Sequence, residues 1–406
     1  MGLLDHAIWW HVYPLGACGA PIYDAETGVH HRLQRLESWL DYAVELGCSG
    51  LLLGPIFTST SHGYDTLDHF SIDPRLGDDA DFDHLVAQAQ QRGLSIVLDG
   101  VFNHVGAQHE LVRQAVEAGA GLVKLTTGPD GVSPLGWEGH AELAELDHDN
   151  PAVVELVVQI MLHWLHRGVA GWRLDAAYCV PTRFWDTVIK RVREEFPQAV
   201  FIGEVIHGDY AEIVTQSGLD TVTQYELWKA IWSSITDLNF WELAWALERH
   251  QEFSQTFLPQ TFVGNHDVER IASLIGDSGA VLAVAVLFTV PGTPSIYYGD
   301  EQAFRGRKGH GREADAELRP ALPETPEQLA PVGLWLYRIH QDLIGLRRRN
   351  PWLTRGSVDV VTKENAAIAY RVSGSGHELT VAMTLAPLRQ VDIVVDGEQA
   401  FSWSQS

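Results

Sequence analysis

Eight short apolar runs alternate with helical patterns over the first 350 residues, and no other feature of the chain constrains the fold as strongly. The runs are rich in β-branched and aromatic residues, as strands are. They predict strands at 8–13, 50–53, 95–98, 171–174, 200–203, 221–225, 261–263 and 295–298, and helical periodicity predicts helices at 33–46, 82–92, 151–166, 184–195, 241–253 and 333–348. Eight strands that alternate with helices predict an α/β fold, a closed (β/α)8 TIM barrel.

Two segments interrupt this alternation. Residues 105–146, after the third strand, are too long for an ordinary loop and carry turn signals at Gly128-Pro129-Asp130-Gly131. Residues 351–406 lose the helical period and predict short strands at 358–361, 366–372, 379–384 and 390–395. The sequence therefore predicts a catalytic barrel of residues 1–104 and 147–350, a short inserted domain of residues 105–146 and a small C-terminal antiparallel β domain of residues 351–406.

Composition and charge narrow the class of protein. A hydrophobic fraction of 46% with 20% charged residues is typical of a globular protein, and a net charge of −25 disfavours nucleic acid and membrane as partners. Residues 1–10 lack the pattern of a secretory signal, and the apolar stretch 280–288 predicts a buried helix. Three widely spaced cysteines, which we expect to be buried, argue against a disulfide framework or a zinc site. We therefore expect a cytoplasmic protein with a neutral ligand.

Four of the predicted strands end on a carboxylate. Asp99, Asp175 and Glu204 each end a short apolar run, and Asp267 ends the run Phe262-Val263-Gly264-Asn265-His266-Asp267. Because the C-termini of parallel barrel strands open on one face, we expect these four acids to share one cleft. Acids that converge in a cleft shift their pKa values or act on a ligand, so this set is the candidate site.

The spacing of these acids suits glycoside hydrolysis. A retaining glycosidase needs two carboxyl groups about 5–5.5 Å apart, and the strands that carry Asp175 and Glu204 are consecutive, about 4.8 Å apart in a sheet. Arg173 shares a strand face with Asp175 and would hold it ionised as a nucleophile. The apolar run before Glu204 favours the protonated form that a general acid needs. Asp267 can hydrogen-bond sugar hydroxyls and stabilise an oxocarbenium-like transition state.

The same residues admit two other interpretations. Strand-end acids bind magnesium in barrels that form enolates, but Arg173 beside Asp175 opposes a cation there. The acids could also form structural ion pairs, an interpretation that suits one carboxylate better than a set of four.

Six motifs occur in a fixed order along the chain and carry a family resemblance. They are Gly54-Pro55-Ile56-Phe57 with Gly63-Tyr64-Asp65, Asp99-Gly100-Val101-Phe102-Asn103-His104, Gly171-Trp172-Arg173-Leu174-Asp175, Gly203-Glu204-Val205, Val263-Gly264-Asn265-His266-Asp267, and Pro294-Ser295-Ile296-Tyr297-Tyr298-Gly299-Asp300-Glu301. Along nearly all its length the chain resembles the α-amylase family of retaining α-glycoside hydrolases, glycoside hydrolase family thirteen.

The resemblance implies a role for each motif residue. Asp175 corresponds to the nucleophile, Glu204 to the general acid/base and Asp267 to the transition-state stabiliser. The residues implied in substrate binding are Tyr64, which would stack on the sugar, Asp99 at the floor of the site, His104 and His266 as hydrogen-bonding groups, and Arg173 beside the nucleophile. Among the tryptophans, Trp137 and Trp228 are the better candidates for sugar stacking.

Calcium is the one cofactor that the resemblance raises. Many family members bind it through the asparagine of the first motif, here Asn103, together with an aspartate from the inserted domain. This chain has Glu145 where that aspartate often lies, and its insertion is short. We therefore expect Asn103 to be structural, no metal ligands in the site and no obligatory calcium.

The expected function is hydrolysis of α-1,4-linked glucooligosaccharides by double displacement, with a neutral oligosaccharide as the partner. The same residues would serve a transglycosylase, in which a sugar hydroxyl replaces water, or an α-glucosidase for α-1,6 or other linkages. A non-catalytic sugar-binding relative is a further alternative, which the presence of Arg173, Asp175, Glu204 and Asp267 disfavours.

Overall fold

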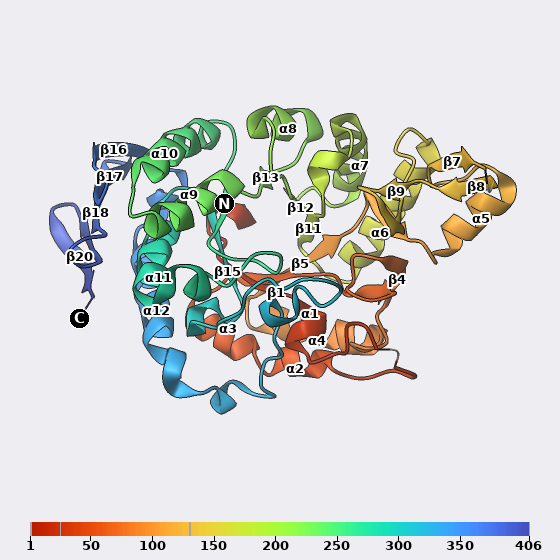
Figure 1. Ribbon diagram of the computed structural model, residues 1–406, viewed down its shortest axis with the longest axis horizontal. Coiled ribbons are helices and arrows are strands. Elements are labelled where there is room, and N and C mark those ends of the chain that lie inside the picture. Colours follow the sequence, from red (N-terminus) through yellow and green to blue (C-terminus); the bar gives the residue numbers. More distant parts are fainter. Residues whose placement is uncertain (1, 25, 130, 406) are drawn as a thin grey trace.

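Eight parallel strands form the central sheet, in the order β13-β12-β11-β5-β2-β1-β15-β14 (Figure 1). The computed structural model describes residues 2–24, 26–129 and 131–405. The strands are β1 (Trp9–Val12), β2 (Gly50–Leu53), β5 (Ser95–Gly100), β11 (Gly171–Leu174), β12 (Val200–Gly203), β13 (Thr221–Val222), β14 (Gln260–Phe262) and β15 (Thr293–Tyr297). A parallel bridge between Thr223 and Gln260 joins the two outer strands and closes the circle. The predicted (β/α)8 barrel is confirmed.

Alternating side chains explain why these runs form a barrel. Trp9, Leu52, Val97 and Ile202 form a small apolar cluster of their own, separate from the large core to which the intervening residues, such as Trp10, belong. Successive residues of a strand point to opposite faces, so every strand buries both of its faces. Polar residues such as Arg173 and Asp99 occupy strand positions beyond the small cluster, toward the C-terminal ends of the strands.

The outer layer consists of helices. They are α2 (Leu33–Glu37), α3 (Leu40–Leu46), α4 (Asp79–Gln91), α6 (Pro151–His166), α7 (Thr182–Glu195), α8 (Tyr210–Ser217), α9 (Tyr225–Thr236), α10 (Trp241–Ser254), α11 (Ile271–Thr289) and α12 (Leu334–Arg349). Side-chain caps define the starts of several: Asn150 accepts a hydrogen bond from the Ala152 amide at α6, and Asp78 accepts from Ala80 and Asp81 at α4.

Three local predictions were wrong. The segment 33–46 forms two helices, because the chain breaks at Trp39, whose ring stacks on Trp10 and whose indole nitrogen donates to the Pro323 carbonyl. The strand expected at 221–225 ends at Val222, and Tyr225 begins α9, where the Gln224 side chain caps the helix. Cys18 and Cys48 are buried as expected, but Cys179 is exposed.

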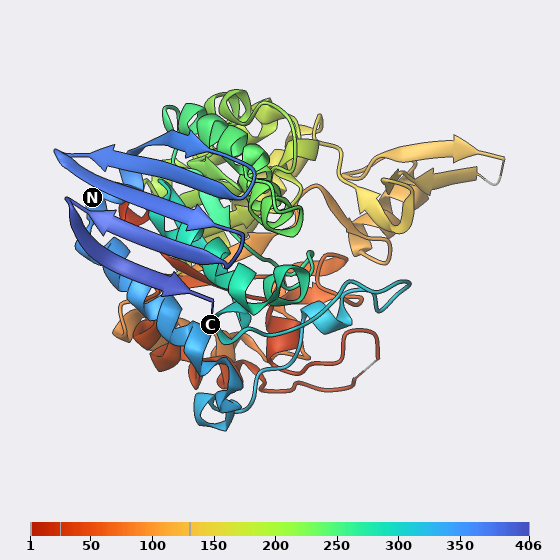
Figure 2. The ribbon, with the colours of Figure 1, turned by 60° about the vertical axis from the view of Figure 1, so that its left-hand side comes forward.

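The segment after the third barrel strand projects from the barrel as a small lobe (Figure 2). It contains β6 (His104–Gly106), α5 (Glu110–Ala118), β7 (Leu125–Gly128), β8 (Gly131–Pro134), β9 (Gly136–Trp137) and β10 (His140–Glu145). β7 and β8 pair as a hairpin around the predicted turn, whose Asp130 lies outside the described residues. β6, β10 and β9 form a separate antiparallel sheet. This sheet holds Trp137 at the edge of the cavity described below.

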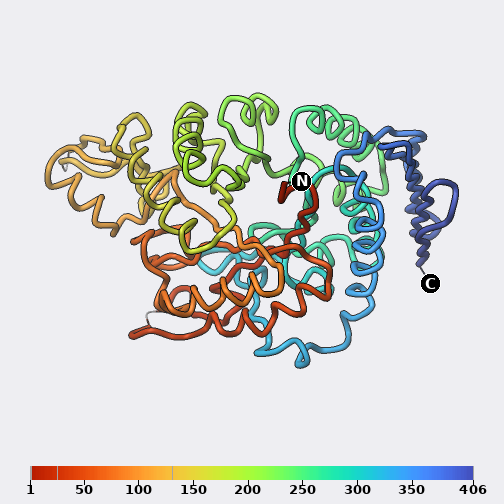
Figure 3. Tube along the Cα trace, turned by 180° about the vertical axis from the view of Figure 1, so that it is seen from behind, coloured from red at the N-terminus to blue at the C-terminus, as the bar shows by residue number. Residues whose placement is uncertain are grey.

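The C-terminal segment forms a five-stranded antiparallel sheet at the end of the molecule opposite the lobe (Figure 3). Its strands are β16 (Ser357–Lys363), β17 (Ala367–Gly374), β18 (His377–Thr384), β19 (Gln390–Val395) and β20 (Glu398–Ser404). The first four correspond to the predicted strands, and β20 was missed because its first three residues are polar or small and exposed. The sheet packs against α10, α11 and α12, far from the C-terminal ends of the barrel strands.

α11 is the most apolar helix of the barrel wall. It contains the expected apolar stretch 280–288 and, at 19 residues and a mean hydropathy of 2.1, has the length and composition that a membrane span requires. Most of it is nevertheless buried inside the molecule, where it packs against α9 and α12. The prediction of a buried helix is therefore confirmed.

Arg347 connects α12 to the end of α11 and supplies a stability prediction. Its buried guanidinium donates to the carbonyls of Phe288, Val290 and Gly292, at 3.0, 2.8 and 2.5 Å. Replacing it by methionine would leave these carbonyls without their charged donor, so Arg347→Met should lower the free energy of unfolding by about 3 kcal/mol. Urea denaturation measures the difference. Arg349→Met, an exposed arginine of the same helix, should have little effect, and equal losses for the two variants would contradict the assignment.

Candidate active site

A cavity of about 560 Å³ opens at the C-terminal ends of the barrel strands. Five of the predicted residues line it: Tyr64, His104, Asp175, Glu204 and Asp267. The other three, Asp99, Arg173 and His266, are nearly fully buried and bonded to lining residues. All eight predicted residues therefore converge. Trp137 also lines the cavity, whereas Trp228 packs against Phe262 and does not.

The guanidinium of Arg173 joins three of the four strand-end carboxylates. Nη1 lies 2.6 Å from both oxygens of Asp99 and 3.3 Å from Oδ1 of Asp175, and Nη2 lies 2.8 Å from Oε1 of Glu204. The register of the sheet explains this, because Arg173 of β11 stands directly opposite Asp99 of β5. Arg173 was expected beside Asp175, yet it contacts Asp99 and Glu204 more closely.

Asp175 is strongly coupled to Glu204. Burial raises the pKa of Asp175 well above its ordinary value, and the Glu204 carboxylate raises it further, while Arg173 acts in the opposite direction. Double displacement needs Asp175 in its ionised form, and the contact with Arg173 favours that form.

Glu204 has polar neighbours, which corrects the expectation of an apolar environment. Besides Arg173, it accepts hydrogen bonds from the Ala176 amide at 3.0 Å and from the Tyr225 hydroxyl at 3.1 Å. Ala176 has a φ of 45°, a left-handed conformation that is uncommon for alanine. This turn directly after Asp175 points the Ala176 amide toward Glu204. The hydrogen bonds orient the Glu204 carboxyl group at the cavity edge.

Asp267 is held by His266 of its own motif and by two cations, Arg319 and Lys308, that no motif indicated. Its Oδ1 lies 2.9 Å from Nη2 of Arg319, and its Oδ2 lies 3.1 Å from Nε2 of His266. Lys308 donates to the backbone carbonyl of Asp267 at 3.0 Å. With 38% of its side chain exposed, Asp267 faces the cavity more openly than Asp175 or Glu204. Arg319 and Lys308 belong to the loop after β15, whose sequence has no strand or helix periodicity from which their position could be predicted.

The two histidines of the motifs are bound to other protein groups. Nε2 of His104 lies 3.0 Å from the Tyr64 carbonyl and must carry the proton, so Nδ1 accepts from the Asn103 amide at 3.1 Å. Burial lowers the pKa of His104 to about 4, which keeps the ring neutral. Nε2 of His266 contacts the Tyr64 hydroxyl as well as Asp267. Direct contact of either ring with a sugar stays a prediction.

Tyr64 and Tyr225 complete the hydrogen-bond network. The Tyr64 hydroxyl donates to Oδ2 of Asp99 at 3.0 Å, which ties a cavity wall to the buried floor. Tyr225 receives a hydrogen bond from the Asn265 amide at 2.9 Å while it donates to Glu204. Sequence reasoning missed Tyr225, because it was placed at the end of a strand rather than at the start of α9.

Comparison with known proteins identifies the family of this chain. Residues 24–124 and 137–328 match the family described as "Alpha amylase, catalytic domain". The chain belongs to the α-amylase family. Neopullulanase 2 of Thermoactinomyces vulgaris is 32% identical over 337 residues, which cover 79% of this chain and 56% of that protein. The present chain thus spans a little over half the length of this relative.

Two other relatives match over nearly their full length. A 4-α-glucanotransferase of Thermotoga neapolitana is 26% identical over 408 residues, which cover 86% of this chain and 90% of that protein. The ligand-free structure of the cyclic α-maltosyl-(1→6)-maltose hydrolase of Arthrobacter globiformis is 26% identical, with a TM-score of 0.82 over 99% of this chain and 98% of that chain.

Calcium, which many α-amylase family members bind, does not fit the donors at the corresponding place. Glu145 stands where an aspartate ligand is common in the family, and its Oε2 lies 2.9 Å from the ammonium group of Lys124. The side-chain amide of Asn103 is hydrogen-bonded to His104. A lysine ammonium next to the acid supplies the positive charge that a calcium ion would bring, so no step of the chemistry is assigned to a metal.

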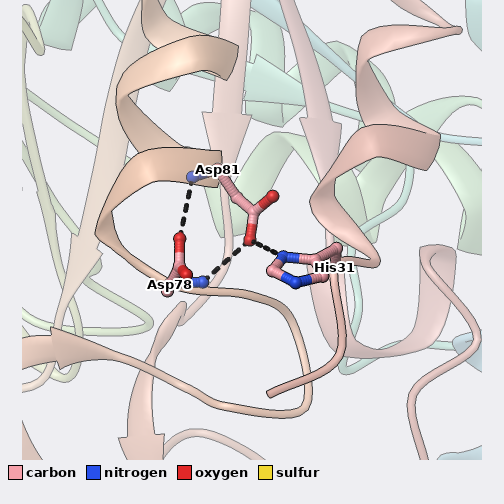
Figure 4. Close-up of side chains that lie close together, drawn as sticks. All are labelled: His31, Asp78 and Asp81. Carbon is pink, nitrogen blue, oxygen red and sulfur yellow. Dashed lines mark hydrogen bonds and ion pairs between the residues drawn. The ribbon is translucent and has the colours of Figure 1, made fainter.

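Another cluster has the spacing of metal ligands, but its side chains already make hydrogen bonds that cap a helix. His31, Asp78 and Asp81 bring their ligand atoms within 4.8 Å of one another (Figure 4). Oδ2 of Asp81 accepts from the His31 ring at 2.6 Å and from the Asp78 amide at 3.0 Å, and Oδ1 of Asp78 accepts from two amides at the start of α4. These bonds form a capping box and account for the cluster without an ion.

The coupling of Asp175 to Glu204 predicts a pH dependence. Since Asp175 must ionise to act as a nucleophile, its raised pKa places the acid limb of kcat/KM above the range of an ordinary aspartate, about 3.9. Glu204→Gln removes the neighbouring charge that raises this pKa, so the acid limb should move to lower pH. The substrate should be α-maltosyl fluoride, whose leaving group needs no protonation, with fluoride release as the readout.

The control for this shift is another carboxylate of the same cavity. Glu138→Gln changes a lining residue that is not among the groups acting on Asp175, so its acid limb should stay at the wild-type position. An acid limb that stays in place or rises in Glu204→Gln would contradict the coupling.

Proposed function

We propose that the protein is a retaining α-glycoside hydrolase that cleaves α-1,4-linked glucooligosaccharides by double displacement. The observation that carries this proposal is the contact of one guanidinium with both Asp175 and Glu204 at the edge of an open cavity. Contact with one group brings the two carboxyl groups close together, as retention requires. The comparisons support the proposal through the names of the relatives, among them a neopullulanase and a cyclic α-maltosyl-(1→6)-maltose hydrolase.

In the first half-reaction, Asp175 attacks the anomeric carbon while Glu204 protonates the departing oxygen. Arg173 keeps Asp175 oriented, and the Ala176 amide and the Tyr225 hydroxyl keep the Glu204 carboxyl group facing the leaving-group side. The bond to the leaving sugar breaks as the bond to Asp175 forms, which gives a covalent glycosyl-enzyme.

In the second half-reaction, Glu204 removes a proton from water, which attacks the glycosyl-enzyme and releases Asp175. Asp267 stabilises both transition states by hydrogen bonds to the hydroxyls of the reacting sugar, and Arg319 and His266 fix its carboxylate. Asp99 supports the floor through Arg173, and Tyr64 supplies the apolar surface for the sugar.

Transglycosylation is the alternative that uses the same residues. A sugar hydroxyl would then replace water in the second half-reaction, and the similarity to a 4-α-glucanotransferase keeps this alternative open. The absence of an obligatory metal and a cytoplasmic location also remain proposals; the ion pair of Glu145 with Lys124 supports the first, and three free cysteines support the second.

Loss of the nucleophile tests the mechanism. Asp175→Asn should lower kcat for maltotriose about 10⁴-fold or more, because amide oxygen cannot form the glycosyl ester, with little change in the melting temperature. Reducing-sugar release measures kcat, and Asp237→Asn, an exposed aspartate at the end of α9, is the matched control. Near-normal turnover in Asp175→Asn would refute the mechanism. Products longer than a maltohexaose substrate, if dominant for the wild type, would instead favour the transglycosylase.

Chelation tests the metal proposal. Because Lys124 supplies positive charge beside Glu145, incubation with excess EDTA followed by gel filtration should leave kcat and the melting temperature unchanged within error. Lys124→Met offers a sharper comparison, since it frees Glu145 and should create weak calcium-dependent stabilisation that the wild type lacks. Activity that EDTA abolishes and calcium restores in the wild type would overturn the proposal.

A further inference from the structure

A small cavity lies inside the barrel, beneath the acid/base Glu204. Its volume is about 20 Å³. Glu204 and Arg173 border it on the side of the active site, and Leu52 borders it on the side of the small apolar cluster. A site for one buried water needs about 10–15 Å³ of such space and two to four polar partners. The cavity therefore has the size of a single water molecule.

Three polar side chains around this cavity have atoms without a hydrogen-bond partner among the described residues. These atoms are Nε2 of His11 on β1, Oε1 of Gln260 on β14 and Oγ of Ser295 on β15. All three residues are more than nine-tenths buried. Because a buried polar atom without a partner costs free energy, native proteins pair such atoms with ordered water where there is space. Three of them around one small space indicate a built site.

The charges around the cavity favour a neutral ligand. The guanidinium of Arg173 would repel a cation, and the carboxyl group of Glu204 would repel an anion. Burial lowers the pKa of His11 well below its ordinary value, so its ring adds no charge. Oε1 of Gln260 accepts hydrogen bonds, whereas the neutral ring of His11 and the hydroxyl of Ser295 can donate or accept. Water, which donates two hydrogen bonds and accepts two, matches this set.

The cavity touches the acid/base and not the nucleophile. Glu204 lines both this cavity and the catalytic one, whereas Asp175 and Asp267 line only the catalytic one. Oε1 of Glu204 lies 2.8 Å from Nη2 of Arg173 and accepts from the Tyr225 hydroxyl at 3.1 Å, and both of these partners also border the small cavity. A water bound here would support the Glu204 carboxyl group from the barrel side, opposite the sugar.

We propose that the small cavity binds one water molecule through His11, Gln260 and Ser295, and that this water positions Glu204 for proton transfer. The water is not the one that attacks the glycosyl-enzyme, and the three side chains are positioning residues. The water site itself is independent of the proposed function, whereas its effect on proton transfer rests on the proposed glycosidase activity.

A high-resolution crystal structure of the wild type tests the site without any substrate. One ordered water should lie in the cavity, within hydrogen-bond distance of at least two of the three side chains. Crystals soaked in sodium bromide test for an anion instead, since bromide scatters anomalously. An anomalous peak in the cavity, or a cavity without electron density, would overturn the inference whether or not the protein is a glycosidase.

Ser295→Val tests the positioning role. Valine removes the hydroxyl group and fills the space of the water with a methyl group. The loss of one hydrogen bond near a charged group should lower kcat/KM for maltotriose about tenfold. For α-maltosyl fluoride, whose leaving group needs no protonation, kcat/KM should change less than about threefold. Gln260→Leu removes another partner of the water and should show the same selectivity, so it serves as the test if Ser295→Val does not fold.

Thr293→Val is the matched control. Thr293 lies two residues before Ser295 on the same face of β15, and its buried hydroxyl also has no partner among the described residues, but it does not line the cavity. Both of its rates should stay at the wild-type value. Equal losses for the two substrates in Ser295→Val, or unchanged rates in a variant whose crystal structure lacks the water, would overturn the positioning role. If the wild type cleaves neither substrate, the glycosidase function fails, and the crystal structure alone decides the water site.

Discussion

The site depends on the burial of Arg173. One guanidinium contacts Asp99, Asp175 and Glu204, the ends of three neighbouring strands, so it neutralises charges that would otherwise repel one another inside the barrel. Removing it would leave three acids in a space of low polarity, where they could persist only by taking up protons. The arginine thus fixes the geometry of the three acids and lowers the electrostatic cost of burying them together.

A second set of cations acts on the opposite wall. Arg319 and Lys308 reach Asp267 from a loop rather than from a strand, and Arg319 also stacks over the ring of Tyr13 at 4.6 Å. Asp267, the fourth acid, is therefore fixed by a loop and not by the barrel strands that hold the other three. This division suits an enzyme whose chemistry resides on strands and whose specificity resides in loops.

Sequence reasoning predicted the elements whose cause is local. Short apolar runs predicted all eight strands, and Asn150 predicted the start of α6. Both predictions were possible because side-chain periodicity and helix capping depend only on residues that are close in sequence. The convergence of the four acids could also be predicted, because it requires only that each acid lies at the C-terminal end of a parallel barrel strand. Arg319 could not be predicted as a partner of Asp267, because the two residues share no sequence pattern. Tyr225 was assigned to a strand because Gln224, whose side chain caps its helix, is not among the residues typical of an N-cap.

The closure of the barrel has a consequence for its local stability. β13 has only two residues, and the bridge from Thr223 to Gln260 is the seam that connects it to β14. Every other pair of neighbouring barrel strands has more paired residues, so the contact between β13 and β14 is the weakest strand pairing of the barrel. Tyr225 follows the seam on one side and Asn265 on the other, and their hydrogen bond spans it above the acid. The orientation of the Glu204 carboxyl group therefore depends on whether β13 and β14 stay paired.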